Sequence, residues 1–300
     1  MSTVMRRLLT VTCMLVCLSG CVSTVSNQAF TPGWVDAQCS PDSVKVGSIC
    51  MDKYEASVWD IPATNTALIR KVRMGTVTVA DLGGVNQVGV GSGDYNCAND
   101  GKGCAGKIYA VSVSGVQPSG YITWFQAQQA CANSLKRLPT NAEWQMAVSG
   151  TPDSTATDSS SCNVTGATKV ASGSMPNCVS AWGVYDMGGN MLEWVTDWTP
   201  LPVQHPSDGS LKAKVCPGWK FSYTDPVTHV LTVAFDSDDA MCFAGSDVEG
   251  DPKGPAALQR GGFFGLDAAN AALAGPLTIE GRTPPWAGKE IDIYGFRCAR

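Results

Sequence analysis

The chain has 300 residues, a net charge of −5 at pH 7, 32 Gly, 17 Pro and 13 Cys. A mildly acidic chain without basic clusters argues against nucleic acid as a partner, because phosphate binding needs clustered Lys and Arg. The abundant Gly and Pro predict many loops and turns, and the cysteines predict an oxidising compartment.

The first twenty residues have the three parts of an export signal. Arg6 and Arg7 are followed by the apolar stretch 8–18 and by two small residues before Cys21. The apolar stretch is about half of the ~20 residues that a spanning helix needs, so residues 1–20 are expected to be removed. Their removal changes the net charge from −5 to −7.

The segment Leu18-Ser19-Gly20-Cys21 resembles the lipobox of bacterial lipoproteins, in which the cysteine is diacylated and becomes the first residue. This implies a stable lipid anchor on Cys21, since two acyl chains hold a protein on a membrane. Val22 favours the outer membrane, by resemblance to proteobacterial sorting. An ordinary secretory signal with a chance cysteine remains the alternative. Residues 21–33, rich in polar residues, predict a lipidated tether to the folded part, residues 34–300.

The cysteines beyond Cys21 are even in number, which in an exported chain predicts five disulfides. They are Cys39, Cys50, Cys97, Cys104, Cys131, Cys162, Cys178, Cys216, Cys242 and Cys298. There is no CxxC pair and the whole chain holds only two histidines, so a structural zinc site is not expected.

The first half of the mature chain predicts strands separated by a stapled loop. Residues 48–59 predict a first strand, and 107–113 have a second strand-like alternation. Between them, residues 83–106 are rich in Gly, Asn and Asp and predict a loop pinned by Cys97 and Cys104.

Two helices are expected next. One covers 123–136, and the second runs from Asn141 to about Ser149, after a capping box of Thr140 and Glu143. The inward residues are expected to be Ala127, Ala130, Cys131, Leu135, Trp144, Ala147 and Val148.

Two long connections follow. Residues 151–180 predict a Ser- and Thr-rich loop closed by Cys162 and Cys178. Residues 199–255 are a weakly patterned insertion with room for a Cys216–Cys242 bridge. Loops of this length usually have a function or are disordered, and a disulfide favours order.

Four segments, in this order, resemble the sulfatase-modifying factor family, whose founding activity is formylglycine generation. They are Cys50-Met51-Asp52-Lys53-Tyr54-Glu55, Arg137-Leu138-Pro139-Thr140-Asn141-Ala142-Glu143-Trp144, Trp182-Gly183-Val184-Tyr185-Asp186-Met187-Gly188-Gly189-Asn190-Met191-Leu192-Glu193-Trp194, and Arg260-Gly261-Gly262 with the closing Gly295-Phe296-Arg297-Cys298. The resemblance implies one α+β domain with a C-type-lectin-like, formylglycine-generating-enzyme-like fold. Such a fold has little regular secondary structure, short helices and a small twisted antiparallel sheet. The resemblance also implies a Cys131–Cys298 disulfide. A second family bridge is missing at both ends, where Val148 and Pro276 stand.

The family's oxidising chemistry uses copper held by two cysteines five residues apart, soon after the Gly-Gly pair. The matching positions are Leu266 and Ala271, and no thiol lies between Cys242 and Cys298. Because Cu(I) needs soft ligands such as thiolates, no copper is expected and formylglycine-generating activity is not predicted. Some members hold iron with three histidines, whereas this chain has only His205 and His229, both in the insertion. A site of two histidines and one carboxylate stays formally open, and no catalytic residue is assigned.

Calcium is the cofactor that the resemblance leaves in place. Carried over by position, Asp186 supplies a carboxylate, and Met187, Gly189 and Met191 supply main-chain carbonyls, which are ligands that a hard cation prefers. In the alternative interpretation these residues form a turn, Glu193 is a buried hydrogen-bonding partner and Trp194 belongs to the core. A second acidic group is interpreted as a solvated loop: Asp236, Asp238, Asp239, Asp247 and Glu249.

The function predicted from these observations is that of a lipid-anchored, non-oxidising family member acting as a binding or structural module of the bacterial cell envelope. Its ligand would be a glycan, a cell-wall fragment or a protein, contacted by the 199–255 insertion and the segment Gly262-Phe263-Phe264. The alternative is a metal-dependent oxidoreductase or peptide-modifying enzyme with a divergent site. A structural lipoprotein without a specific ligand is a third hypothesis.

Overall fold

The computed structural model describes residues 38–153, 160–199, 220–224, 231–236, 239, 241–242, 246–248, 251–266, 270–288 and 291–300. The signal segment, Cys21, the tether, Cys216 and both histidines lie outside these residues. Within the described part of the chain, no helix is both long enough and apolar enough to cross a membrane.

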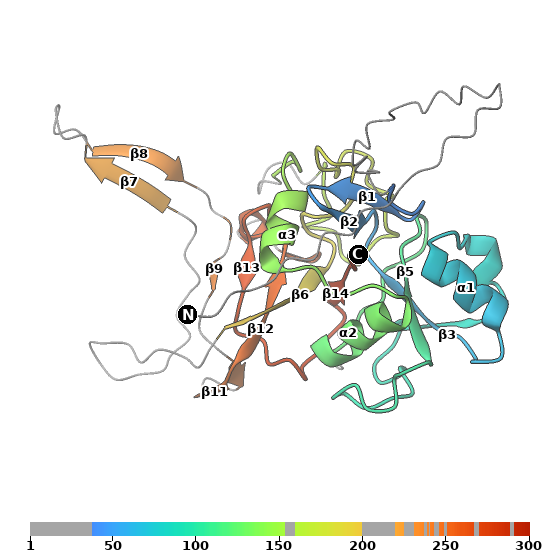
Figure 1. The fold of residues 1–300 in the computed structure, drawn as a ribbon. Helices are drawn as coiled ribbons and strands as arrows, with labels where there is room; N and C mark the ends of the chain where they lie inside the picture. The colour runs from blue at the N-terminus through green and yellow to red at the C-terminus, as the bar shows by residue number, and fades with distance from the viewer. Residues whose placement is uncertain are drawn as a thin grey trace, which may run out of the picture. The chain divides into compact units, whose positions relative to one another are not determined.

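The described chain mixes short helices and strands, with long connections between them (Figure 1). The helices are α1 (Thr66–Met74), η1 (Val79–Leu82), α2 (Trp124–Asn133), α3 (Asn141–Ala147) and η2 (Ala271–Leu273). The first strands are β1 (Ser43–Val46), β2 (Ile49–Asp52), β3 (Ser57–Asp60), β4 (Asn86–Val88), β5 (Ile108–Val111) and β6 (Leu192–Thr199). The later strands are β7 (Lys220–Thr224), β8 (Leu231–Asp236), β9 (Met241–Cys242), β10 (Ser246–Val248), β11 (Asp251–Gly254), β12 (Ala256–Arg260), β13 (Ile279–Glu280) and β14 (Tyr294–Phe296).

The central sheet of the described residues has the order β14-β6-β12-β13-β9. Strand β6 pairs antiparallel with β12 and parallel with β14. Thr199 lies opposite Ala256, so the chain leaves this sheet at Thr199 and re-enters it at the neighbouring position. The predicted insertion therefore begins and ends at one point of the sheet. It contains β7 to β11, of which β9 joins the sheet through β13.

A second sheet has the order β4-β3-β5, and β1 and β2 form a separate hairpin. The predicted single strand over 48–59 is therefore wrong. The residues between β2 and β3 are not in a strand, and β2 and β3 belong to different sheets. Glu55 lies in this break and accepts hydrogen bonds from Asn190 and Met191, more than 130 residues away. The strand predicted over 107–113 is confirmed as β5. The predicted 83–106 loop contains the short β4.

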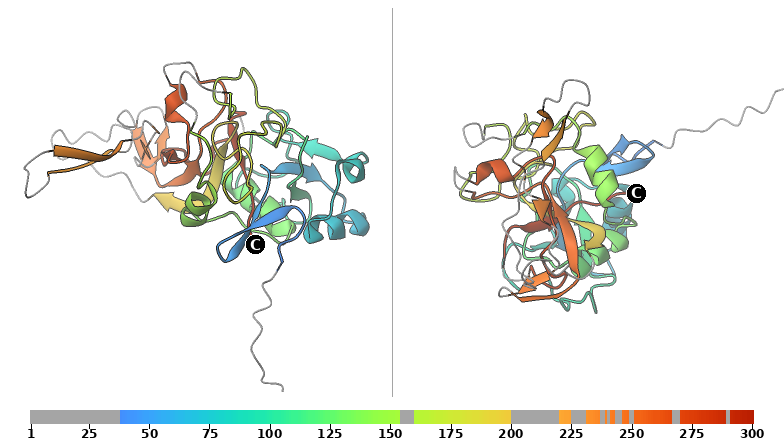
Figure 2. Two further views of the ribbon diagram at one scale, coloured as in Figure 1. Left: turned by 90° about the horizontal axis from the view of Figure 1, so that it is seen from above. Right: turned by 90° about the vertical axis from the view of Figure 1, so that its left-hand side faces the viewer.

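Local capping explains where the two predicted helices begin. The Thr140 hydroxyl accepts from the Glu143 N–H at 3.1 Å, and the Glu143 carboxylate accepts from the Thr140 N–H at 2.8 Å, which confirms the capping box of α3. Thr123 and Gln126 form the same box at α2. Helix α3 packs against β1 and β12 (Figures 1 and 2).

The inward faces of these helices agree with the sequence except at one residue. Ala127, Ala130, Cys131 and Trp144 are fully buried. Leu135 was predicted to be buried and is 64% exposed, because α2 ends at Asn133 and Leu135 turns into the left-handed region with φ of 56°. Helix α1 was not predicted, although Asn65 caps its start and Gly75, with φ of 66°, ends it.

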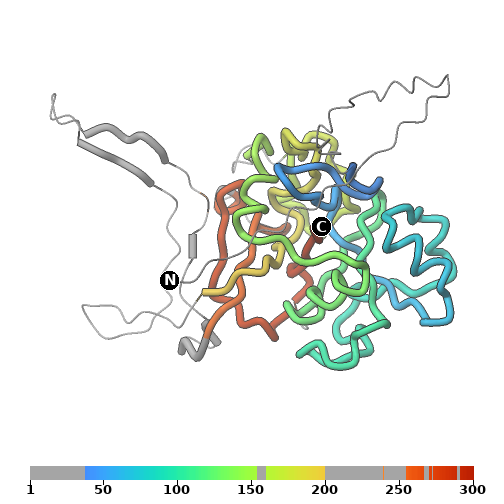
Figure 3. The backbone as a smooth tube through the Cα atoms, viewed as in Figure 1, coloured from blue at the N-terminus to red at the C-terminus, as the bar shows by residue number. Residues whose placement is uncertain are grey.

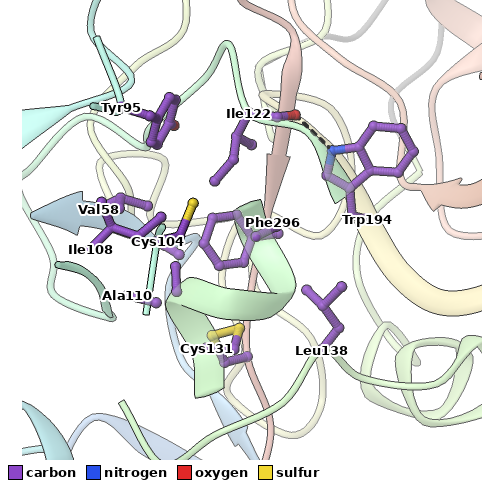
Figure 4. Packing of buried hydrophobic residues seen from close by; sticks show 14 of the residues in the cluster. Val58, Tyr95, Cys104, Ile108, Ala110, Ile122, Cys131, Leu138, Trp194 and Phe296 are labelled. Atoms are coloured by element: carbon purple, nitrogen blue, oxygen red, sulfur yellow. Dashed lines mark hydrogen bonds between the residues drawn. A yellow bond between two sulfur atoms is a disulfide. The ribbon is translucent and has the colours of Figure 1, made fainter. Parts of the chain in front are cut away.

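The main core packs α2, β3, β5 and β14 around Phe296 (Figure 4). Trp194 is fully buried in it and donates from its indole nitrogen to the Ile122 carbonyl at 3.0 Å. Cys131 and Cys298 form a disulfide inside this core, which is the pairing that the resemblance implied. Closing a loop of 167 residues restricts the unfolded chain by about 5 kcal/mol in chain-entropy models.

Three further disulfides join Cys39 to Cys50, Cys97 to Cys104, and Cys162 to Cys178. The last two close the loops in which they were expected. The suggested Cys216–Cys242 bridge lies outside what the structure describes.

The C-terminus closes the described fold against its first hairpin. Figure 3 shows the C-terminus beside this hairpin. Cys50 and Arg300 exchange two main-chain hydrogen bonds of 3.0 and 2.8 Å, and Ala299 bridges to Met51 and Arg137. The buried Lys136 forms ion pairs with Asp42 at 2.5 Å and Asp52 at 2.6 Å. These ion pairs join the segment that follows α2 to the same hairpin. Residues separated by about 250 positions in sequence therefore stabilise one another.

Candidate functional site

The Gly-Gly pair after β12 lies against the 186–191 turn. Gly261 and Gly262 have φ of 89° and 83°. A Cβ on Gly262 would lie only 2.3 Å from Cβ of Ala274, so glycine is required there. Gly261 accepts from the Gly189 N–H at 2.8 Å, which fixes the approach of the two segments.

The two positions that match the family's copper ligands come together in the structure, but as apolar groups. Leu266 and Ala271 belong to one small cluster with Val164 and Ala274. The Leu266 N–H donates to the Val164 carbonyl at 2.9 Å, so the backbone is held as well. Leu266 and Ala271 carry only hydrocarbon side chains, which cannot ligate copper.

A buried charged cluster lies beside this region. Glu193 binds Arg297 through both carboxylate oxygens, at 2.5 and 2.7 Å, and also accepts from the Trp144 indole at 2.7 Å. Both charged groups are about 1% exposed or less. Burial lowers the pKa of Arg297 and the Glu193 carboxylate raises it, and the net result is a raised pKa. Glu193 is thus a buried hydrogen-bonding partner and Trp194 a core residue, as the alternative interpretation of the turn predicted.

Two further carboxylates face the same guanidinium. Burial raises the pKa of Glu55 well above its usual range, and the nearby Asp186 and Glu193 raise it further. Burial also raises the pKa of Asp186 to about 6, although the Gly173 N–H at 2.6 Å and Arg297 lower it. Three carboxylates therefore share one guanidinium, and the raised pKa values of Glu55 and Asp186 favour their protonated forms.

The 186–191 turn is the segment in which the sequence predicted calcium ligands. Asp186 and Asn190 have φ of 59° and 55°, and Gly189 has φ of 75°, so the backbone of the turn is strongly curled. Among the described residues, no three His, Cys, Asp or Glu side chains form a metal-binding group. A calcium ion here would depend on the Asp186 carboxylate and on the main-chain oxygens of Met187, Gly189 and Met191.

A groove of about 470 Å³ opens next to Phe263, and we call it the Phe263 groove. Its walls include Leu192, Ile293 and Tyr294, and its polar groups include Glu280 and Arg282, which form an ion pair at 2.7 Å. Burial raises the pKa of Glu280, whereas Arg282 lowers it.

Gln259, the strand partner of the groove residue Glu280, has unmet hydrogen-bonding capacity. It stands opposite Glu280 in the strand register, so the two side chains share one face of the sheet. Gln259 is fully buried, and neither its amide nitrogen nor its amide oxygen has a hydrogen-bond partner among the described residues. Unsatisfied buried groups are rare in native proteins and call for a specific explanation.

The second acidic group from the sequence is only partly described. Asp238 and Glu249 lie outside the described residues, and the side chains of Asp236 and Asp247 are not described. Asp239 is fully buried and accepts from the Leu277 N–H at 2.7 Å, so it is not part of a solvated loop.

Comparison with known protein families agrees with this arrangement. Residues 43–300 match the model of the sulfatase-modifying factor enzyme 1-like domain. The chain belongs to the sulfatase-modifying factor family. This membership confirms the α+β, formylglycine-generating-enzyme-like fold class predicted from the four segments.

Curated relatives of this family member include two chlamydial proteins. The serine/threonine-protein kinase Pkn1 of Chlamydia trachomatis is 36% identical over 83 residues, which are 26% of this chain and 13% of the kinase. The kinase pkn1 of Chlamydia caviae is 32% identical over 100 residues, 31% of this chain and 16% of the kinase. The chain thus spans less than a fifth of either relative.

Similar solved structures include the major tropism determinant M1 and U1 variants. They have TM-scores of 0.43 and 0.42 and identities of 12% and 14%. Each match covers 88% of this chain and 53% of the tropism determinant.

Proposed function

We propose that this member of the sulfatase-modifying factor family is a non-oxidising binding module of the bacterial cell envelope, anchored by lipid on Cys21. The observation that carries the proposal is the packing of Leu266 and Ala271. The two positions that correspond to the copper thiols lie together in the fold, but both have hydrocarbon side chains. A scaffold that is retained without its metal ligands has kept its surfaces but not this oxidising chemistry.

The Phe263 groove is the proposed ligand site. It follows the Gly-Gly pair directly and combines apolar walls with the Glu280–Arg282 ion pair, in which the glutamate is mostly buried and the arginine is exposed. Its volume lies within the range of about 300–1,000 Å³ that small-molecule sites occupy. The charged groups of Glu280 and Arg282 in its lining support a polar ligand such as a glycan or a cell-wall fragment, since such a ligand supplies hydrogen-bonding groups.

Calcium in the 186–191 turn is proposed as the structural cofactor. The Asp186 carboxylate and the curled backbone of the turn support it, since a carboxylate and main-chain carbonyls are oxygen ligands. The turn contacts the Gly-Gly segment through the Gly189–Gly261 hydrogen bond, so a bound ion would stabilise the wall beside the groove.

The anchor and the outer-membrane location follow from the lipobox-like segment before Cys21 and from Val22. Mass spectrometry of the chain purified from membranes would test the anchor directly. We expect a mature N-terminus at Cys21 with added acyl mass. A free cysteine there would refute the anchoring.

The function is tested by metal analysis and ligand binding on residues 22–300, exported so that the disulfides form. We expect calcium without stoichiometric copper or iron, and saturable binding to a panel of glycans, cell-wall fragments and envelope proteins. Phe263→Ala should weaken that binding at least tenfold, whereas Val90→Ala, a substitution of an exposed residue elsewhere, should not. One copper or iron per chain would instead support the oxidoreductase alternative, and no saturable binding to any panel member would contradict the binding role.

A further inference from the structure

A second cavity lies between α1, the segment before β5 and the end of α2. Its volume is about 560 Å³, and it shares no lining residue with the Phe263 groove. Its walls carry Arg70 and Arg73 from α1, the backbone of Gly106, Tyr109 from β5, and Leu135. Nothing in the proposed function uses this cavity.

The charge of the cavity is opposite to that of the chain. Its lining includes two guanidinium groups and no carboxylate, whereas the whole chain has a net charge of −5. Arg70 makes no ion pair or hydrogen bond with the residues that the structure describes. Arg73 donates from Nε to the Asn133 carbonyl at 3.1 Å and makes no ion pair within the same residues. Two arginines three positions apart on a helix repel each other unless an anion lies between them.

The rest of the wall is apolar. Ile69 and Tyr109 are 8% and 2% exposed, so they form a packed floor. Met74 and Leu135 are 57% and 64% exposed at the same cavity, which makes them two of the most exposed large apolar side chains of the described residues. A ligand with a hydrocarbon body would remove these side chains from water.

Asn133 holds the walls in place. Its side-chain amide nitrogen donates to the carbonyls of Cys104 and Ile108, at 2.9 and 2.7 Å, and its amide oxygen accepts from the Gly106 N–H at 3.0 Å. Its main-chain oxygen accepts from Arg73. One residue therefore connects all three walls, and the cavity is preformed rather than assembled by a ligand.

Leu135 has a conformation that stability alone does not favour. Its φ of 56° lies in the left-handed region, which leucine rarely adopts, and its side chain points to an exposed position. Glycine or asparagine would relieve this backbone strain. Strained residues of this kind concentrate at binding sites, where the side chain is needed.

We infer that this cavity binds a small organic anion with an apolar body, through Arg70 and Arg73 on the anionic group and Met74 and Leu135 on the hydrocarbon. Guanidinium groups suit carboxylates and phosphates because they donate paired hydrogen bonds. Such an anion can be a free amphiphile or a lipid headgroup with its chain. The inference commits to this open cavity and does not depend on the proposed function.

The test uses residues 22–300, which contain the whole compact unit Gln38–Arg300. Calorimetry with decanoate and with decyl phosphate, below their micelle concentrations, should show saturable binding of at least one of them. The uncharged decanol should bind at least tenfold more weakly. Arg70→Gln/Arg73→Gln should lower the affinity at least tenfold, and the exposed Lys102→Gln should leave it unchanged as the control for removing a positive charge.

Leu135→Gly separates binding from folding. We expect it to raise the melting temperature by about 2 °C, because the left-handed strain is relieved, while the affinity falls severalfold. A merely structural Leu135 would give unchanged affinity.

Three results would overturn the inference. They are the absence of saturable binding to both anions, equal binding of decanol, and equal affinity of the double arginine variant. If the protein sediments with phosphatidylglycerol vesicles but not with phosphatidylcholine vesicles, we expect it to bind the monomeric anion as well. If vesicles bind and neither monomeric anion does, the arginines contact a membrane surface and the cavity is not a site.

Discussion

Replacing the buried Lys136 by methionine should destabilise the protein by about 3–5 kcal/mol, because it leaves a buried charge without its partner. The Lys136 ammonium is fully buried and contacts Asp42 at 2.5 Å and Asp52 at 2.6 Å. Asp42 keeps Arg300 at 3.1 Å after the substitution. Asp52 is 1% exposed and keeps only the Cys298 N–H at 3.3 Å, so the loss falls mainly on Asp52.

The dependence on pH gives this prediction a second measurement. Burial raises the pKa of Asp52 to about 6 although Lys136 lowers it, compared with about 3.9 in an unfolded chain. The folded state therefore binds this proton more tightly, and the associated stability is present at low pH and lost as the pH rises through about 6. Without Lys136 the pKa of Asp52 should rise further. The difference between variant and wild type should thus shrink by at least ~1 kcal/mol from pH 7 to pH 5, since one pKa unit is ~1.4 kcal/mol.

Urea unfolding with the disulfides intact measures both effects. The matched control is Lys136→Met/Asp52→Asn, which removes the carboxylate charge together with the ammonium. We expect it to recover about 2 kcal/mol relative to Lys136→Met, because no uncompensated charge remains at Asp52. A loss below 1 kcal/mol for Lys136→Met at pH 7, or no recovery in the double variant, would refute the assignment of the energy to a buried charge.

Three further predictions concern the site. Gly262→Ala should lower the free energy of unfolding, measured in urea, by about 2–3 kcal/mol. The control is Gly265→Ala, because Gly265 has a similar φ of 80° but a Cβ there would meet no atom closer than 3.9 Å, and we expect a loss of only about 1 kcal/mol. Equal losses of stability in the two variants would exclude the clash with Ala274. The double variant Leu266→Cys/Ala271→Cys should bind one Cu(I) in a chelator competition, since both positions share one cluster, and failure to bind would show that they are not placed as a ligand pair. Added calcium at about 100 times its Kd should stabilise the wild type by about 2.7 kcal/mol and leave Asp186→Asn unaffected, and equal stabilisation of both would exclude the 186–191 turn.

Short-range chemistry was predictable from the sequence. A helix N-cap depends on residues three positions apart, so the Thr140–Glu143 box and the start of α3 follow from the chain itself. The stapled loops at Cys97–Cys104 and Cys162–Cys178 are local in the same sense. Helix α1 had comparable signals, with Asn65 before it and Gly75 after it, and could have been found from them.

Where the conformation of a segment depends on a residue far away in the sequence, the local sequence pattern did not predict it. The strand over 48–59 is broken because Glu55 turns to Asn190 and Met191. Leu135 was assigned to the buried face by helical spacing, but α2 ends two residues earlier.

The sequence by itself determined the family and the fold class, because both are carried by residue types at particular positions. Only the tertiary structure decided that Leu266 and Ala271 pack together, that three carboxylates surround Arg297, and that, among the described residues, the α1 cavity forms apart from the Phe263 groove. The physical reason is the range of the interactions. Capping and loop closure act between near neighbours, whereas burial, ion pairing and cavity shape depend on which distant segments the fold brings into contact.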